Sequence, residues 1–335
     1  MADRVAVVVV TYNRKALLVE CLEALLRQTL APERILVIDN AATDGTPELL
    51  AQTGLLNEPS IWYQRLDENL GGAGGFEIGM RLAYSHLDCD WFWLMDDDTI
   101  PTPTALEELL AASRSLASWS PSVLASRVEY WAEPNGLCNL PRFRVNSPWG
   151  ANEPPERLMA AAATGSLPIR NVTFVAPMIS RAAVERHGFP VGGYFIYADD
   201  IEYTGRILKN EFGAMVLASV VRHKTNPALL PHETPPPRFF YHIRNTIWMI
   251  RVSGAYSRSE SFVFVMHTAA ITMQFLLAHR FSWRSVKAIA SAVFQGLFRR
   301  PPSIASKVPA ASPTAGIPNA ETISSKVSSV RRTAG

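Results

Sequence analysis

Short continuous runs of apolar residues recur through the N-terminal third of the chain, and each run ends in a polar loop. Apolar runs of this length without polar alternation are typical of parallel strands that are buried on both faces. The sequence therefore predicts buried strands at residues 5–10, 34–39, 61–65 and 91–95.

Helices are expected between these strands. The first is predicted to be capped by Asn13 and to reach about Gln28, and Pro47 opens a short second helix. A glycine loop at residues 69–75 leads into a third helix, which reaches about Ser85. Alternating strands and helices predict an α/β fold of the doubly wound type, with a mainly parallel sheet flanked by helices and ligands at the carboxyl ends of the strands.

The middle of the chain continues the pattern less regularly. Residues 131–167, rich in prolines, glycines and tryptophans, are predicted to form loops and short strands over the site, as a lid for an acceptor. The other expected elements are a helix at 103–113, a strand at 123–130, a strand at 172–179, a helix at 181–187, a helix from Asp199 to about Asn210 and a strand at 215–221.

The composition is that of a globular protein. The chain has 335 residues, of which 48% are hydrophobic and 19% charged. The formal net charge of +2 argues neither for nor against nucleic acid, and no nucleic-acid partner is expected. Cys21, Cys89 and Cys138 show no CxxC spacing, which indicates neither a disulfide framework nor a zinc site and fits a reduced, cytoplasmic compartment. The apolar run at 5–10 is too short for a signal peptide.

The C-terminal third has a different character. Residues 238–245 begin a helix rich in aromatic residues and arginines, and residues 262–278 are largely apolar but short for a membrane span of about 20 residues. No Asp or Glu occurs between Ser261 and Ala320, while basic residues accumulate, which favours a helical region lying on an anionic membrane surface. Packing on the core or on a second copy of the chain, in a homo-oligomer, is the alternative.

Three domains or segments are therefore expected. Residues 1–230 would form the catalytic domain, residues 231–300 the helical membrane-surface region, and residues 301–335, rich in Ser, Ala, Pro and Thr, a disordered tail.

Three consecutive carboxylates, Asp96, Asp97 and Asp98, follow the fourth apolar run. Adjacent acids repel one another, and at a buried strand end their usual partner is a hard divalent cation. Alternate residues of an extended chain point to opposite sides, so Asp96 and Asp98 are expected to face one ligand while Asp97 points away. An acidic loop without a metal explains the triplet alone equally well.

Other polar residues also stand at predicted strand ends or helix starts. Asp39 could accept hydrogen bonds from a nucleobase or ribose, or stabilise a turn. Asp199 and Asp200 precede a predicted helix, where one could act as a general base or as a helix cap. His223 follows the last predicted strand and could ligate a metal or have a structural role.

The glycine string is a weak signal by itself. Glycines let the backbone approach a bulky group, and a helix N-terminus favours an anion such as a diphosphate. No Gly-Lys-Ser/Thr follows, and the string comes after the third predicted strand, so it is neither a Walker loop nor a good dinucleotide fingerprint.

Taken together, the motifs resemble family 2 glycosyltransferases of the GT-A fold over about residues 4–250. The resemblance is carried by Val-Val-Val-Thr-Tyr-Asn-Arg at 8–14, Val-Ile-Asp-Asn at 37–40, Thr-Asp-Gly-Thr at 43–46, Asn-Leu-Gly-Gly-Ala-Gly-Gly-Phe at 69–76 and the triplet at 96–98. Ala-Asp-Asp-Ile-Glu at 198–202 and Phe-Phe-Tyr-His-Ile-Arg-Asn at 239–245 make the chain most similar to bacterial galactofuranosyltransferases and rhamnosyltransferases that act on lipid-linked cell-wall glycans.

The resemblance implies a role for each candidate residue. Asp200 would be the catalytic base of an inverting enzyme, assisted by Asp199. The metal, Mg²⁺ or Mn²⁺, would be bound by Asp96, Asp98 and His223. The nucleotide-sugar donor would contact Thr11, Asn13, Arg14, Asp39, Asn69, Gly72, Gly74, Gly75, Asp96 and Asp97.

The resemblance also implies the reaction and its location. The best expectation is transfer of galactofuranose from UDP-galactofuranose to a lipid-linked glycan, on the cytoplasmic face of the cell membrane, with dTDP-rhamnose as the alternative donor. Tyr197 stands where many relatives have Trp beside the acidic pair. Two other interpretations of the triplet are a haloacid-dehalogenase-like phosphohydrolase and a nucleotide-sugar-binding protein without activity.

Overall fold

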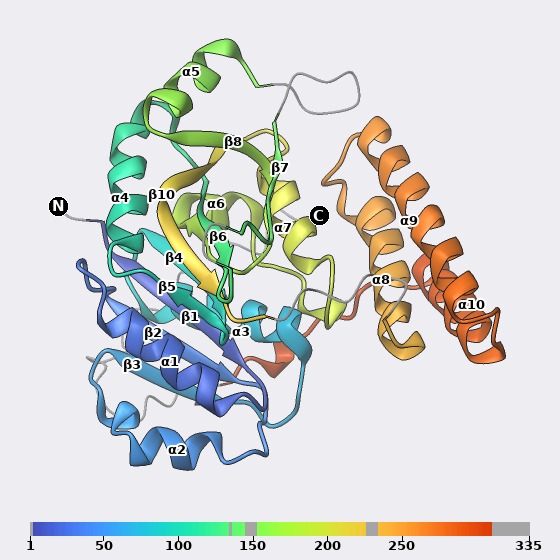
Figure 1. Ribbon diagram of the computed structural model, residues 1–335, viewed down its shortest axis with the longest axis horizontal. Coiled ribbons are helices and arrows are strands. Elements are labelled where there is room, and N and C mark those ends of the chain that lie inside the picture. Colours follow the sequence, from blue (N-terminus) through green and yellow to red (C-terminus); the bar gives the residue numbers. More distant parts are fainter. Residues whose placement is uncertain (1–2, 134–135, 145–152, 226–233, 310–335) are drawn as a thin grey trace.

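The computed structural model describes residues 3–133, 136–144, 153–225 and 234–309. One sheet forms the centre of the molecule, and its strand order is β3-β2-β1-β4-β9-β6-β10-β8-β7, with β5 paired to β10 (Figure 1). The strands are β1 Val5–Thr11, β2 Arg34–Asp39, β3 Ile61–Arg65, β4 Trp91–Asp96, β5 Thr99–Pro101, β6 Val123–Tyr130, β7 Arg142–Phe143, β8 Ser166–Asn171, β9 Pro177–Ser180 and β10 Gly213–His223.

The first four strands are parallel, as predicted, and β1 lies between β2 and β4. Alternate residues of β1 enter different hydrophobic clusters. Val5, Val7 and Val9 pack with the cluster that includes α1 and α4, whereas Ala6 and Val8 pack with the cluster that includes α3. Both faces of the strand are therefore covered, which is why its sequence is continuously apolar.

Helices cover both faces of the sheet, so the predicted fold class is confirmed (Figure 1). The helices of this domain are α1 Lys15–Leu26, α2 Thr46–Gln52, α3 Gly71–His86, α4 Ala105–Ser115, α5 Pro155–Ala163, α6 Arg181–His187 and α7 Asp199–Ile207, with short turns η1 Leu55–Asn57, η2 Ala117–Trp119 and η3 Gly192–Tyr194.

Two predictions about helix starts are wrong. Asn13 does not cap α1: its backbone φ is 53°, and its side-chain Oδ1 accepts a hydrogen bond from the Thr43 amide instead. The glycine string is largely helical, because α3 begins at Gly71. A Cβ at Gly75 would lie 2.5 Å from Val10 Cγ1, so this glycine allows α3 to pack closely on β1.

The predicted strand at 172–179 is also wrong, because β8 ends at Asn171 and only residues 177–179 of the prediction lie in a strand, β9. The intervening residues leave the sheet, and Thr173, Phe174 and Val175 line a cavity. In the region predicted as loops and short strands, helix α5 forms as well, while residues 134–135 and 145–152 of the proposed lid lie outside the described part of the chain.

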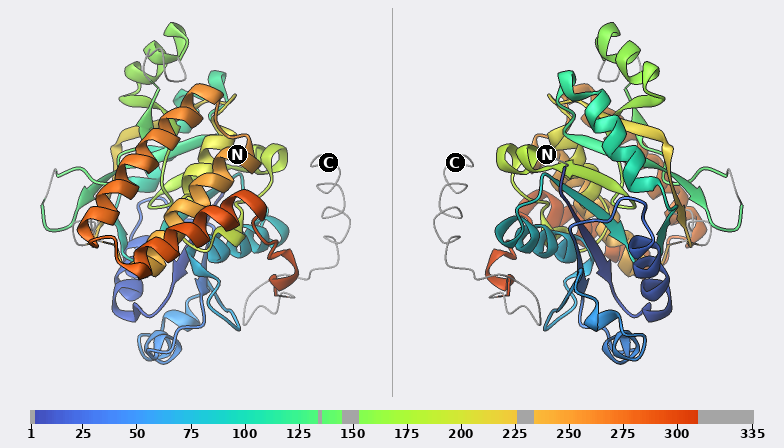
Figure 2. Two further views of the ribbon diagram at one scale, coloured as in Figure 1. Left: turned by 90° about the vertical axis from the view of Figure 1, so that its right-hand side faces the viewer. Right: turned by 90° about the vertical axis from the view of Figure 1, so that its left-hand side faces the viewer.

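The C-terminal helices form a separate layer beside the sheet domain (Figures 1 and 2). They are α8 Pro236–Trp248, α9 Arg258–Ala278 and α10 Trp283–Phe298, with a π-helical turn η5 at Met249–Ser253. Phe239 of α8 and Phe275 of α9 stack with ring centroids 3.9 Å apart at the centre of the layer.

Helix α9 is longer than the apolar stretch predicted. Its 21 residues and mean hydropathy of 1.6 would suffice to cross a membrane by length and composition alone, and 11% of the apolar window is buried. The expectation that this stretch is too short to span a bilayer is therefore wrong.

The tail predicted to be disordered begins too early at residue 301. Ile304 is buried in the cluster on the α3 face of the sheet, and the following turn η6 spans Ala305–Lys307. A Cβ at Gly193 would lie 2.2 Å from the Pro302 carbonyl oxygen, so this segment packs closely on η3. The rest of the predicted tail, from residue 310, lies outside the described residues.

Candidate active site

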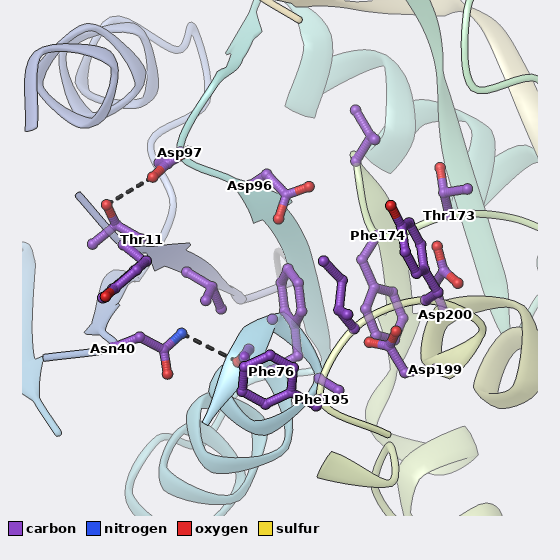
Figure 3. Close-up of a pocket in the computed structure, with 18 of the residues that line it drawn as sticks. Thr11, Asn40, Phe76, Asp96, Asp97, Thr173, Phe174, Phe195, Asp199 and Asp200 are labelled. Carbon is purple, nitrogen blue, oxygen red and sulfur yellow. Dashed lines mark hydrogen bonds between the residues drawn. The ribbon is translucent and has the colours of Figure 1, made fainter. Parts of the chain in front are cut away.

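A cavity of about 550 Å³ lies at the carboxyl ends of β1 and β4, where the fold class places ligands (Figure 3). Its walls come from distant parts of the chain, which the sheet brings together. The lining residues are Val10, Thr11, Tyr12, Arg14, Asn40, Asn69, Gly71, Gly72, Ala73, Phe76, Asp96, Asp97, Asn139, Thr173, Phe174, Val175, Phe195, Ile196, Tyr197, Asp199, Asp200, His223 and Arg238.

The acidic triplet divides between two sides, as the alternation of an extended chain predicts. Asp97 points toward β1, where its carboxylate accepts a hydrogen bond of 2.7 Å from the Thr11 hydroxyl (Figure 3). Asp98 accepts hydrogen bonds from Arg14 at 2.7 Å and from His223 Nε2 at 3.0 Å. Ligand atoms of Asp96, Asp98 and His223 lie within 4.8 Å of one another.

The donor set of this cluster fits a divalent cation. Two carboxylates and an imidazole suit Mn²⁺ or Mg²⁺ better than a soft metal. Burial, followed by the negative charges of Asp98 and Asp97, raises the pKa of Asp96 well above its usual value. A cation at this position would remove that penalty by neutralising the repulsion between the acids.

His223 is oriented for ligation by its second ring nitrogen. Its Nδ1 lies 3.0 Å from Asn139 Oδ1, and an amide oxygen can only accept, so Nδ1 carries the proton of this contact. Nε2 is then the ring nitrogen that faces Asp98, and it would exchange its hydrogen bond to that carboxylate for a bound cation. Burial alone would raise the pKa of Asp98, but the hydrogen bond and charge of His223 and the charge of Arg14 outweigh it and lower the pKa.

Asp199 and Asp200 form the opposite wall of the cavity. They stand at the start of α7 and face Asp96 across the space in Figure 3. Burial raises the pKa of Asp200 to about 6, and burial together with the charge of Asp200 raises the pKa of Asp199 well above its usual value. The pair therefore combines one group that ionises near neutrality with a second group that retains its proton more strongly.

Most of the predicted site residues are brought together by the fold. Thr11, Arg14, Asn69, Gly72, Asp96, Asp97, Asp199, Asp200 and His223 line the cavity, and Asp98 lies against His223.

Four residues that were predicted to contact the nucleotide-sugar donor do not line the cavity. The Asp39 carboxylate is fully buried and accepts hydrogen bonds from the Ala42 amide and the Tyr63 hydroxyl, so it stabilises the loop after β2. Asn13 holds Thr43, as described above. Gly74 and Gly75 face Leu70 and Val10 because they lie inside α3.

Several lining residues were missed by sequence reasoning. Thr173 and Phe174 were hidden by the prediction of a continuous strand, and the Thr173 hydroxyl is buried with no hydrogen-bond partner among the described residues. Asn40 follows Asp39 directly and was detectable as a strand-end residue. Asn139 and Arg238 gave no positional signal, since non-local packing alone brings them to the cavity.

Comparisons with known proteins agree with this geometry. The profile of the family described as "Glycosyl transferase family 2" matches residues 6–164. Galactofuranosyltransferase GlfT1 of Mycolicibacterium smegmatis is 31% identical over 228 residues, which are 64% of this chain and 69% of that protein.

Solved structures share the fold at low sequence identity. The S. aureus protein TarS (residues 1-349), in complex with UDP-GlcNAc, matches with a TM-score of 0.58 and 13% identity over 88% of this chain and 81% of its own. GalNAc-T7 with UDP, GalNAc and Mn²⁺ matches with a TM-score of 0.57 and 14% identity over 80% of this chain and 55% of its own.

These similarities decide among the interpretations of the acidic triplet. The extent of the match to GlfT1 establishes the family, and the phosphohydrolase and the inactive binding protein are thereby excluded. The chain is a glycosyltransferase and belongs to glycosyl transferase family 2.

Proposed function

We propose that the enzyme transfers galactofuranose from UDP-galactofuranose to a hydroxyl of a lipid-linked glycan, with a divalent cation and with inversion at the anomeric carbon. The observation that carries this proposal is the pairing of two acidic groups across one cavity. Asp96, Asp98 and His223 form one side, and Asp199 and Asp200 form the other.

The donor would lie along the β1, β4 and α3 side of the cavity. Thr11 and Asn40 come from neighbouring parallel strand ends, and Gly72 stands in the first turn of α3, where a helix N-terminus favours a diphosphate. Arg14 adds a cation at the same wall, which would bind the diphosphate before and after the sugar leaves.

Mg²⁺ or Mn²⁺ would be held by Asp96, Asp98 and His223. When bound, such an ion neutralises negative charge that develops on the nucleoside diphosphate leaving group. Arg14 donates a hydrogen bond to the Asp98 carboxylate, so it would also keep this ligand in its place.

Asp200 would act as the general base. Its pKa of about 6 leaves the carboxylate ionised at neutral pH. Because this pKa is close to neutral pH, the carboxylate also accepts a proton readily. As Asp200 removes the proton of the acceptor hydroxyl, the hydroxyl oxygen forms a bond to the anomeric carbon. The bond from that carbon to the diphosphate oxygen breaks on the opposite face, which inverts the configuration.

A membrane-bound acceptor is supported by the C-terminal layer. Helices α9 and α10 expose large apolar side chains, and the region after Ser261 lacks acids up to Ala320. Arg238, at the start of α8, lines the cavity and so connects the layer to the site. We therefore place the enzyme at the cytoplasmic face of a membrane.

A donor panel tests the proposal. UDP-galactofuranose, dTDP-rhamnose and UDP-galactopyranose are each incubated with Mn²⁺ or Mg²⁺ and a lipid-linked glycan, and the released nucleoside diphosphate and the product configuration are measured. We expect UDP release and an inverted product with the first donor. Release of dTDP alone would identify the alternative rhamnosyltransferase, and a retained configuration would contradict the mechanism.

The base is tested by Asp200→Asn, which keeps the shape of the side chain and removes its basicity. We expect transfer to fall by about 10²–10⁴-fold. UDP should still bind, because the residues proposed to bind the donor lie on the β1, β4 and α3 side of the cavity and not on α7. An equal loss of transfer and UDP binding would disprove the assignment of the base.

A further inference from the structure

Three residues that precede Asp199 have backbone angles that side chains rarely adopt. The φ angles of Phe195, Tyr197 and Ala198 are 69°, 67° and 66°. A residue other than glycine is strained in this region, so the conformation persists only where its surroundings hold it. Because the segment continues directly into α7, its path sets where the acid pair begins.

Asn245 of α8 binds the backbone of this segment. The side chain is 0% exposed, and its Nδ2 lies within hydrogen-bond distance of three carbonyl oxygens: Tyr194 at 3.0 Å, Ile196 at 2.7 Å and Tyr197 at 2.9 Å. An amide nitrogen has two protons, so at least one of them is shared. One side chain thereby satisfies the carbonyls on both sides of the strained positions.

Arg244 fixes the orientation of that amide. Its Nε donates to Asn245 Oδ1 at 3.0 Å, which turns Asn245 Nδ2 toward the carbonyls. Its Nη2 donates to the Tyr194 carbonyl, also at 3.0 Å. The guanidinium carbon lies 4.1 Å from the Trp248 ring centroid. Since aromatic rings rather than carboxylates surround it, burial lowers the pKa of Arg244 to about 10.

The segment is also held by α3, on the side of the cavity where the nucleotide sugar is proposed to bind. The Ala73 amide of α3 donates to the Phe195 carbonyl at 3.2 Å. A Cβ at Gly71 would lie 2.0 Å from that same oxygen, so only a glycine permits the contact. The strained segment is therefore clamped between the first turn of α3 and the middle of α8.

We infer that Arg244 and Asn245 are positioning residues of the transfer reaction. They hold the backbone of residues 194–198 in its strained path. In this way they place Asp199 and Asp200 opposite the side of the cavity that is proposed to bind the donor. This inference rests on the proposed function of Asp200. It makes catalysis dependent on α8, the first helix of the C-terminal layer.

The test is Asn245→Leu, which retains a similar volume and removes the three contacts from Asn245 Nδ2 to the carbonyls of the segment. We expect kcat to fall about 100-fold, the effect of a displacement of about 1 Å in a reacting group. The KM for the donor and the Mn²⁺-dependent affinity for UDP should stay unchanged. Thr246→Val, whose hydroxyl bonds only to the His242 carbonyl of its own helix among the described residues, is the matched control and should keep the wild-type kcat.

Hydrogen exchange provides a readout that does not depend on turnover. Amides of residues 195–203 should exchange faster in Asn245→Leu than in wild type, and equally in Asp200→Asn and wild type. A wild-type kcat with unchanged exchange in Asn245→Leu would overturn the inference. Faster exchange in an enzyme whose Asp200→Asn variant remains active would instead reject the proposed base while leaving the clamp in place.

A milder variant covers a failure of Asn245→Leu to fold, which loss of UDP binding would reveal. Arg244→Gln leaves the Asn245 amide present but removes the guanidinium that orients it. A smaller loss of kcat with unchanged UDP affinity is expected, and a parallel loss of both would overturn the inference.

Discussion

The sheet domain and the C-terminal layer are both rich in apolar residues, but the sheet domain buries its apolar side chains whereas the layer exposes many of them. Every residue of β1 is buried, whereas only Glu260, Ile271 and Phe275 of α9 are buried. Trp283 and Phe298, at the two ends of α10, are 76% and 73% exposed. Exposed apolar faces of this kind are typical of interaction sites, and under the proposed function this one lies on the membrane surface.

The two regions also differ in charge. The cavity gathers Asp96, Asp97, Asp98, Asp199 and Asp200, while no acid follows Glu260 in α9 or α10. Under the proposed function, the acids of the cavity bind a cation and the acid-free helices lie on an anionic surface. Polar contacts such as those of Arg170 and Asn245 join the two regions, and there the comparison can be tested.

The largest effect is expected at Arg170, which joins β8 to the start of α9. Its buried guanidinium donates to Glu260 at 2.9 Å and to the carbonyls of Gly205 and Ala255. Arg170→Ala leaves Glu260 buried without its main partner, which should lower the free energy of unfolding by about 3–5 kcal/mol. Urea denaturation followed by fluorescence measures this change.

Arg142 provides the control for that prediction. It lies 4.0 Å from Glu260 and is considerably more exposed than Arg170, so Arg142→Ala should cost less than about 1 kcal/mol. Equal losses in the two variants would show that the bridge does not hold the layer on the sheet domain.

The exposed apolar residues of the layer are expected to affect a different quantity, the affinity for a membrane, and not the free energy of unfolding. The double variant Trp283→Ser/Phe298→Ser should weaken binding to phosphatidylglycerol vesicles, by at most about 1.5–3 kcal/mol for each side chain. Vesicle co-sedimentation measures it. Leu30→Ser, an exposed apolar change on the sheet domain, should leave binding unaltered, and an equal loss in both variants would contradict the assignment of the membrane surface.

A change of pH should separate the two regions further. Asp200 must be ionised to act as a base, and burial raises its pKa to about 6, so the rate should fall about tenfold per pH unit below that value. The same raised pKa affects stability in the opposite direction: the folded state should be more stable at lower pH. Protonation of Asp200 stabilises the folded state, and this contribution is lost as pH rises through about 6.

Measurements of the rate and of thermal unfolding between about pH 5 and 8 check both directions of change. This is roughly the range in which histidine and this carboxyl change charge. Vesicle binding should remain constant on the acidic limb of the rate profile. A rate that is independent of pH below 6 would exclude Asp200 as the base.

The smallest effect is expected at an exposed ion pair of α1, Arg27 with Glu23, at 3.4 Å. Arg27→Ala should change the free energy of unfolding by about 0.3–0.5 kcal/mol and leave transfer and vesicle binding unaltered. This variant sets the baseline against which the other changes are judged. A loss comparable to that of Arg170→Ala would show that burial does not decide the strength of these pairs.

The agreement between sequence and structure is uneven for a physical reason. The four parallel strands were predicted because a strand buried on both faces has a local signature, and strand ends of a parallel sheet meet at one edge. Asp96, Asp97 and Asp98 therefore reached the cavity as expected. Asp39 also stands at a strand end, but Tyr63 and Ala42 occupy its carboxylate.

The errors fall where contacts distant in sequence override local preference. Glycines at 71–75 predict a loop by propensity, but close packing of α3 on β1 makes them helical. The run at 172–179 has strand composition, yet residues 172–176 lie outside the sheet, and Thr173 and Phe174 line the cavity.

The four parallel strands, the family and the acids of the site can be inferred from the sequence alone, because they depend on local patterns and on strand ends. Which of these groups face one another depends on how the elements pack. The bonds from Asn245 to residues 194–197 span 48–51 positions, and the bond from Arg170 to Glu260 spans 90. Such contacts have no local signature, because each depends on the packing of several elements at once.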